Sequence, residues 1–440
     1  MPDSARVDSP QRDSPVASQP PPEVGGPYAY YVLSVLFVVY IFNFIDRQIL
    51  AILLQPIKED LKISDTALGF LTGSAFALFY TFAGLPLALV ADRWVRRSLI
   101  AISLATWSIM TAVSGLARGF TDLTLARIGV GIGEAGATPP AHSLIADYFP
   151  PEKRATAFAI YASGIYVGVG IGFFVGGWIN DRYGWRTAFY VVGLPGLLMA
   201  LIVRLTVREP PRGLSETHVT IGRQYTINEV WQFFGKVPAG RNASLAGAFH
   251  AFVGYGLSTW IPAFFVRLHG MTPGSLGRWL SWITAIGGLV GAFAGGWIAD
   301  RWARSNPRAR PYVGMIGALL STVPLFVTLL VTDTQLALLF LLPYNIFTTL
   351  WLGPTVAIIQ ELVPPAMRSM ASAVFLFIVT IIGLGAGPQV VGIMNDWIGT
   401  REAIRYSLLS VAIIMNIIAA WFFWLTAKTL EQDMEAKKRL

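Results

Sequence analysis

Long apolar stretches, separated by short clusters of charged, proline and glycine residues, dominate the chain from residue 28 to residue 428. A helix needs about 20 predominantly apolar residues to cross the hydrocarbon core of a bilayer. By that measure the pattern predicts twelve membrane-spanning helices, at residues 28–54, 66–91, 95–116, 121–148, 153–179, 186–207, 243–268, 274–301, 311–332, 334–362, 367–394 and 402–428.

The polar segments between the apolar runs recur, in the same order, in the two halves of the chain. Residues 91–97 (ADRWVRR) return as 299–305 (ADRWARS), and residues 150–154 (PPEKR) return as 364–368 (PPAMR). Duplicated membrane halves of this kind are typical of secondary transporters in which one half rocks against the other. The repeat therefore predicts an all-α integral membrane fold of two pseudo-symmetric six-helix bundles.

The expected organisation follows from the polar interruptions. We expect a disordered cytoplasmic tail, an N-terminal bundle, a cytoplasmic linker, a C-terminal bundle and a second cytoplasmic tail, at residues 1–27, 28–208, 209–241, 242–428 and 429–440. Apolar residues at helical spacing in the linker predict a short helix on the membrane surface: Ile227, Val230, Trp231 and Phe234.

Composition and charge agree with a membrane protein. Hydrophobic residues make up 54% of the chain and charged residues 13%, with a mean hydropathy of +0.57, whereas soluble domains contain about 25% charged residues. The chain has no cysteine, which excludes disulfides and thiolate metal sites. Residues 1–27 contain no apolar core of a signal peptide, so the first span is expected to direct insertion.

The net charge of +8 is distributed unevenly among the loops. Lysine and arginine concentrate in the loops on the side of both termini, for example at 93–97 and 301–310, and are fewer on the opposite side. This positive-inside bias predicts that both termini are cytoplasmic. It also accounts for the basic excess without nucleic-acid binding, for which the sequence contains no compact basic and aromatic module.

Charged side chains within the hydrocarbon region are costly and by default mark function. Four lie well inside the predicted spans: Asp46 and Arg47 in the first span, Arg127 and Glu134 in the fourth. At a rise of about 1.5 Å per residue, Asp46 and Arg127 lie at similar depth in the outer half, with Glu134 near the midplane. We therefore expect one polar cluster in the N-terminal half.

Two interpretations of this cluster are open. It is either a static salt-bridge network that fixes helix packing, or a site for proton coupling and gating. In the second interpretation Asp46 and Glu134 bind protons, and Arg47 and Arg127 are their charge partners. Burial favours the neutral form of a carboxyl group, whereas a neighbouring guanidinium favours the carboxylate. A movement that separates them would therefore drive proton binding, and we favour this interpretation.

The C-terminal half has no counterpart to these charges, and its spans carry aromatic and weakly polar residues instead. The residues expected to line a substrate cavity are Asn43, Tyr255, Trp260, Tyr344, Asn345 and Trp351. A cavity with one charged wall and one aromatic wall suits an amphiphile better than a sugar, which needs many hydrogen-bonding groups.

Charged residues also cluster where spans end on the cytoplasmic side. A carboxylate at a helix end beside an arginine of the next loop forms an ion pair that can break when helices move. We expect such a latch from Asp92, Arg93, Arg96, Arg97, Asp147, Asp300, Arg304 and Glu361. Because solvated ion pairs contribute little stability, the latch should bias the protein toward outward-facing conformations rather than hold the fold.

Two sets of motifs resemble known transporter families. The segment 91–97 resembles the signature loop between the second and third helices of the major facilitator superfamily. The segments RIGVGIGEA (127–135), ADYF (146–149), GWR (184–186) and REPP (208–211) resemble the Spinster family of sphingolipid and lysophospholipid transporters and their bacterial relatives. This second resemblance is strong over residues 30–215 and weak in the other half. It implies that Asp46 and Glu134 are protonation sites and that Arg47 is a gating residue.

The leading hypothesis is a proton-coupled secondary transporter of amphipathic, lipid-like or drug-like molecules in a bacterial inner membrane. We expect it to act as a monomer, with a small amphipathic substrate, protons and membrane lipids as partners. The alternatives are a transporter or facilitator of a small organic anion, held by Arg47 and Arg127, and a receptor that transports nothing. The sequence contains no phosphate-binding loop, and its four histidines are scattered, so we expect no enzyme activity, cofactor or metal.

Overall fold

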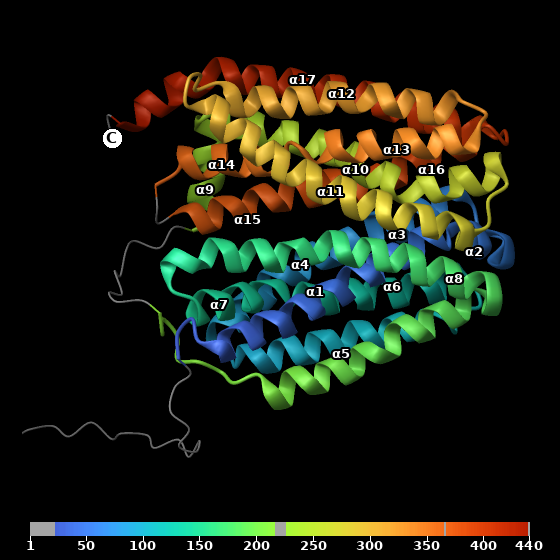
Figure 1. Ribbon diagram of the computed structural model, residues 1–440, viewed down its shortest axis with the longest axis horizontal. Coiled ribbons are helices and arrows are strands. Elements are labelled where there is room, and N and C mark those ends of the chain that lie inside the picture. Colours follow the sequence, from blue (N-terminus) through green and yellow to red (C-terminus); the bar gives the residue numbers. More distant parts are fainter. Residues whose placement is uncertain (1–22, 216–225, 365–366, 439–440) are drawn as a thin grey trace, which may run out of the picture.

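The computed structural model describes residues 23–215, 226–364 and 367–438, and these are predominantly helical (Figure 1). The predicted N-terminal tail falls mainly on residues 1–22, which lie outside the described residues. One bundle contains α1 (Pro27–Ile52), α2 (Leu54–Leu61), α3 (Asp65–Thr72), α4 (Ser74–Arg93), α5 (Arg96–Ser114), α6 (Phe120–Ala135), α7 (Thr138–Tyr148) and α8 (Pro151–Thr206). The other contains α10 (Pro238–His269), α11 (Pro273–Ala303), α12 (Ala309–Leu330), α13 (Thr334–Thr349), α14 (Leu352–Leu362), α15 (Arg368–Val379), the π-helix η2 (Thr380–Ala386), α16 (Gly387–Ile398) and α17 (Ala403–Lys438).

The described residues contain ten helices that are long and apolar enough to cross a membrane. One of them, α8, is 56 residues long and turns at Gly184, where φ is 80° and ψ is 165°. This conformation is almost confined to glycine, and it divides α8 into two crossings. Together α6 and α7 cover the predicted fourth span; they are separated because prolines at the start of α7 cannot continue a helical hydrogen-bond ladder. The all-α fold with two six-helix bundles is thus confirmed.

In each bundle a long helix, α1 or α10, packs closely against a glycine of a neighbouring helix. A Cβ on Gly168 of α8 would lie 2.6 Å from the carbonyl oxygen of Ile41, so only glycine allows α1 this close. The second bundle repeats the arrangement, because a Cβ on Gly387 would lie 2.5 Å from the carbonyl oxygen of Phe252 in α10. The sequence repeat is therefore also a repeat of packing.

The linker contains one described helix, α9 (Ile227–Lys236). Thr226 and Glu229 form a reciprocal capping box at its start, which satisfies backbone donors that would otherwise lack partners. Val230 and Phe234 are buried in the core of the C-terminal bundle, whereas Trp231 is exposed. The apolar face of α9 is thus turned to the protein.

The two bundles lie beside each other, and the helices of both run roughly along the long axis of the molecule (Figure 1). We call the end where α1 begins and α17 ends the basic end, and the other the distal end. At the distal end α3 packs against α16, and α8 packs against α11. A Cβ on Gly177 of α8 would lie 2.2 Å from the carbonyl oxygen of Pro273, which shows how closely the halves approach there.

Hydrogen bonds between the two halves occur from the middle of the molecule to the distal end. Ser74 at the start of α4 donates a hydrogen bond to the carbonyl oxygen of Gly385 in η2, 3.0 Å away. Within the described part of the chain, the hydrogen bonds that join the two bundles lie at this level or nearer the distal end. Among the described residues, hydrogen bonds therefore join the bundles toward the distal end and not at the basic end.

Candidate functional site

The four intramembrane charges predicted to cluster lie together between α1 and α6. Arg47 Nε donates a hydrogen bond to Glu134 Oε2 at 2.7 Å, and Arg127 Nη1 donates to Asp46 Oδ1 at 3.4 Å. The pairing of Asp46 with Arg127 agrees with their expected equal depth. Two acids and two arginines leave the cluster neutral when all are ionised, which limits the cost of burying them.

A third helix joins the cluster through Thr111 of α5, which the sequence analysis did not single out. The Thr111 hydroxyl donates a hydrogen bond to Asp46 Oδ2. Asp46 and Thr111 are both buried, with 2% and 1% of their surface exposed. A threonine inside an apolar span is too common for its sequence position alone to identify it as a ligand of Asp46.

The two ion pairs differ in their surroundings. The Arg47 side chain is 17% exposed, and its guanidinium lies about 5 Å from the ring centres of Phe44, Phe76 and Tyr80. The Arg127 side chain is 3% exposed. Glu134 Oε1 is buried and has no hydrogen-bond partner among the described residues. A proton could therefore bind this oxygen without displacing an existing donor.

Of the six residues expected to line a substrate cavity, the structure places two at a small cavity. Tyr344 and Asn345 line a cavity of about 60 Å³ with Ser258 and Thr348, and Phe173 of α8 in the other bundle also lines it. Tyr255 is 36% exposed.

The other three residues of this set are buried, as Tyr344 is. Trp260 has no exposed surface, and its Nε1 donates to the carbonyl oxygen of Pro388 at 2.9 Å. Trp351 packs edge-on against His250, and Asn43 is 3% exposed. Sequence position alone does not show which face of a helix each side chain occupies.

An ion-pair network that the sequence analysis missed joins the halves at the distal end. Asp65, at the start of α3, accepts hydrogen bonds from Arg267 Nη1 at 2.5 Å and Nη2 at 2.8 Å. Lys58 also donates to Asp65, and Arg267 Nε donates to Gln55 Oε1 at 2.6 Å. Because Arg267 lies in the C-terminal bundle and its partners lie in the N-terminal bundle, these bonds hold the distal end closed.

The same helix start is held by Asp396 of α16. Its carboxylate accepts from the backbone N–H groups of Asp65, at 3.1 Å, and Thr66, at 2.7 Å. A carboxylate at a helix N-terminus satisfies free backbone donors and interacts favourably with the helix dipole. Ser64 caps the Ala67 N–H from within the N-terminal half, whereas the acceptor for Asp65 and Thr66 comes from the other half, so opening the distal end would leave these two N–H groups without it. We call Asp65, Arg267, Lys58, Gln55 and Asp396 the distal latch.

Another carboxylate at the distal end, that of Asp60 in α2, pairs within its own half. Arg186 Nη1 and Trp185 Nε1 both donate to Asp60 Oδ2. The hydrogen bond from Arg186 lowers the pKa of Asp60 below its ordinary value. Asp60 is therefore a useful comparison for the distal latch, because it is ionised at neutral pH but does not join the bundles.

At the basic end, the expected latch residues of the first half contact one another and the chain after α8. Arg96 has no exposed surface. It donates to Asp147 at 2.5 Å, to Glu209 at 2.7 Å and to the carbonyl oxygen of Pro210 at 2.9 Å. We call these bonds the Arg96 clamp. The partners of Arg96 lie in the N-terminal bundle or at the start of the linker, so the clamp does not connect the two bundles.

Of the remaining residues expected in the cytoplasmic latch, some form ion pairs or hydrogen bonds and others are exposed. Arg97 Nη1 donates to the carbonyl oxygen of Val207 at 3.0 Å, and Arg93 is exposed. The side chain of Asp92 lies outside the described residues. In the second half, Arg310 pairs with Glu361 at 2.5 Å and with Asp300 at 3.4 Å, whereas Arg304 is exposed. Glu209 and Arg310 thus complete pairs that the sequence motifs show only in part.

Comparison with known proteins identifies the family. The Major Facilitator Superfamily pattern matches residues 36–388. The chain belongs to this superfamily. An MFS-type efflux pump of Mycolicibacterium smegmatis is 33% identical over 415 residues, which cover 93% of this chain and 95% of the pump. Human protein spinster homolog 1 is 28% identical over 431 residues, covering 91% of this chain and 81% of that protein.

A solved structure gives the same result for the fold. The crystal structure of a bacterial homolog of the human lysosomal transporter Spinster, in an inward-facing and unoccupied conformation, has a TM-score of 0.84 and 32% identity. The match covers 93% of this chain and 99% of that one. The resemblance to the Spinster family is confirmed, and this major facilitator protein is a multi-pass membrane transporter rather than an enzyme.

Proposed function

We propose that the protein is a proton-coupled secondary transporter of amphipathic molecules in a bacterial inner membrane, and that it works by alternating access. The positive-inside bias supports a cytoplasmic basic end with both termini on that side. In this orientation the halves are joined on the outer side and separate on the cytoplasmic side, so the structure corresponds to an inward-facing conformation.

The ion pair of Arg47 with Glu134 carries the proposal. Glu134 is fully buried, yet one of its oxygens has no hydrogen-bond partner among the described residues. A proton on Glu134 would cancel its charge, leave the four-residue cluster with a net charge of +1, and weaken the hold on Arg47. Coulomb attraction over such a distance is strong in a medium of low dielectric constant. Protonation therefore supplies a driving force for moving Arg47.

The surroundings of Arg47 connect this change to the distal latch. Two of the rings beside its guanidinium, Phe76 and Tyr80, belong to α4. Helix α4 follows α3 after a break at Gly73, and α3 begins with Asp65. A displacement of Arg47 acts on α4 directly and can be passed along this helix pair to the contacts of Asp65. Proton binding and opening of the distal end would thereby be coupled.

The contrast between the bundles supports an amphipathic substrate. Charged groups occur inside the spans of the N-terminal half, whereas the facing C-terminal helices offer Tyr255, Tyr344 and uncharged polar groups. A polar head could approach Arg47, the more accessible arginine, while an apolar body contacts the aromatic side chains. Arg127 is occupied by Asp46 and is almost fully buried, which favours an amphiphile over an anion clamped by both arginines.

Uptake into proteoliposomes with and without an imposed pH gradient tests the proposal. We expect a lysolipid to accumulate only with the gradient, and Glu134→Gln and Asp46→Asn to abolish the gradient dependence while the protein remains folded. If gradient-driven transport survives in both variants, these carboxyl groups do not couple protons. The cluster would then be interpreted as a static salt-bridge network that fixes helix packing. Transport of small organic anions instead would support the alternative substrate class, and binding without uptake would indicate a receptor.

A further inference from the structure

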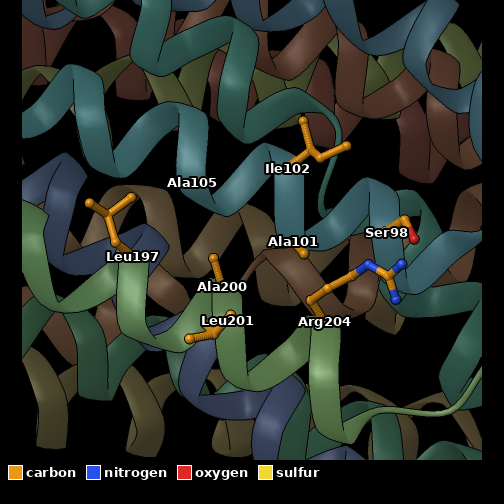
Figure 2. A pocket seen from close by; sticks show the side chains of 8 residues that line it. All are labelled: Ser98, Ala101, Ile102, Ala105, Leu197, Ala200, Leu201 and Arg204. Atoms are coloured by element: carbon orange, nitrogen blue, oxygen red, sulfur yellow. The ribbon is translucent and has the colours of Figure 1, made fainter.

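A groove on the surface of the N-terminal bundle lies outside the transport path. It runs between α5 and the final part of α8 and has a volume of about 330 Å³ (Figure 2). Ala101 and Ala105 form one wall, and Leu197 and Leu201 form the other. Small alanine side chains on α5 leave room that larger residues would fill. An apolar groove on the outer surface of a membrane-spanning bundle is exposed to lipid.

One end of the groove is polar. Ser98 and Arg204 line it at the basic end, and the Arg204 side chain extends toward Ser98 (Figure 2). From Arg204 to Leu197, and from Ser98 to Ala105, is seven residues, or about 10 Å along each helix. The groove thus has a charged end at the membrane surface and an apolar length that reaches into the hydrocarbon region.

The positive charge at this end has no acidic partner among the residues that the structure describes. Arg204 is exposed and makes no ion pair among the described residues. Arg97 lies close by, since its Nη1 bonds to the Val207 carbonyl oxygen one turn beyond Arg204. The nearby carboxylate of Glu209 is already bound to Arg96 and to the backbone N–H of Arg97. Within the described ranges, an anion at Arg204 would therefore meet no competing acidic side chain.

We infer that this groove binds one anionic phospholipid from the leaflet at the basic end. Its phosphate would lie at Arg204 and Ser98, and one acyl chain would occupy the space between α5 and α8. An arginine and a hydroxyl can both donate hydrogen bonds to phosphate oxygens. A zwitterionic lipid fits the apolar part equally well but gains less from the positive end. The inference does not depend on which substrate is transported.

Native mass spectrometry of the detergent-purified protein tests the site, with phosphatidylglycerol and phosphatidylcholine of identical acyl chains as probes. We expect phosphatidylglycerol to bind about fivefold more tightly, the effect of one basic residue at an anionic headgroup. Arg204→Gln should abolish this preference, and Arg204→Lys should keep most of it. Arg304→Gln is the matched control, because Arg304 is an exposed arginine at the same end of the other bundle.

Binding in the apolar part of the groove needs a separate variant. Ala105→Leu should weaken both lipids equally, because it fills the space of the acyl chain and leaves Arg204 in place. Equal binding of the two lipids by the unaltered protein would overturn the inference. So would an equal loss in Arg204→Gln and Arg304→Gln, since that would mean general attraction to a basic surface.

Discussion

Replacing Asp65 with asparagine should open the distal end of the transporter. Asp65 is 2% exposed and accepts two hydrogen bonds from Arg267, at 2.5 and 2.8 Å. Breaking a buried ion pair costs about 3–5 kcal/mol. Asparagine keeps one acceptor oxygen, so we expect the closed distal end to lose about 2–3 kcal/mol relative to open conformations. Because about 1.4 kcal/mol is a factor of ten, the equilibrium should shift roughly 30- to 150-fold.

Distances between two spin labels can measure this shift. The chain has no cysteine, so cysteines introduced at Lys62 and Thr400, which are exposed on opposite halves of the distal end, would be the only labelling sites. In Asp65→Asn the longer distances should gain population. The double variant Asp65→Asn with Arg267→Gln should shift little further, because both changes remove the same contact.

Asp60→Asn is the control for charge at this end. The pKa of Asp60 is lowered by the hydrogen bond from Arg186, so Asp60 remains a carboxylate down to the acidic range. Any stability from this pair is present above the ordinary aspartate pKa of about 3.9 and is lost only as the pH falls through the lower folded value. At neutral pH the control therefore removes one ionised carboxylate but no contact between halves. Unchanged distances in Asp65→Asn, or an equal shift in Asp60→Asn, would refute the latch.

Three further outcomes are expected. Gly177→Ala should also favour the open distal end, because its Cβ would lie 2.2 Å from the Pro273 carbonyl oxygen, whereas Gly296→Ala, with no atom within 4 Å, should leave the label distances unchanged. Arg96→Ala should lower the free energy of unfolding by about 3 kcal/mol without changing those distances, since the Arg96 clamp does not connect the two bundles. A change in the distances without a loss of thermal stability would instead support a gating role for Arg96. Affinity for lysolipids should rise with acyl length by up to about fourfold per methylene, from about 0.8 kcal/mol each, and a flat series in a binding titration would contradict an amphipathic substrate.

The helices and the duplication were predictable from the sequence because both depend on local patterns. A span of about 20 apolar residues must satisfy its backbone hydrogen bonds internally, so hydropathy alone locates it. The same reasoning located the intramembrane charges, and the fixed helical rise matched Asp46 with Arg127 in depth before any contact was known. Breaks inside spans, such as that between α6 and α7, also follow from local proline chemistry.

What the tertiary structure decided is which of these residues meet. The rotation of each helix about its axis directed Trp260 Nε1 to the Pro388 carbonyl oxygen, and it paired Arg47 with Glu134. Arg267 and Asp65 are 202 positions apart, and no local pattern links them. Their contact exists only because the two bundles close at the distal end. Hydropathy is a property of each segment by itself, whereas an ion pair between segments depends on how both are packed, and the second cannot be read from the first.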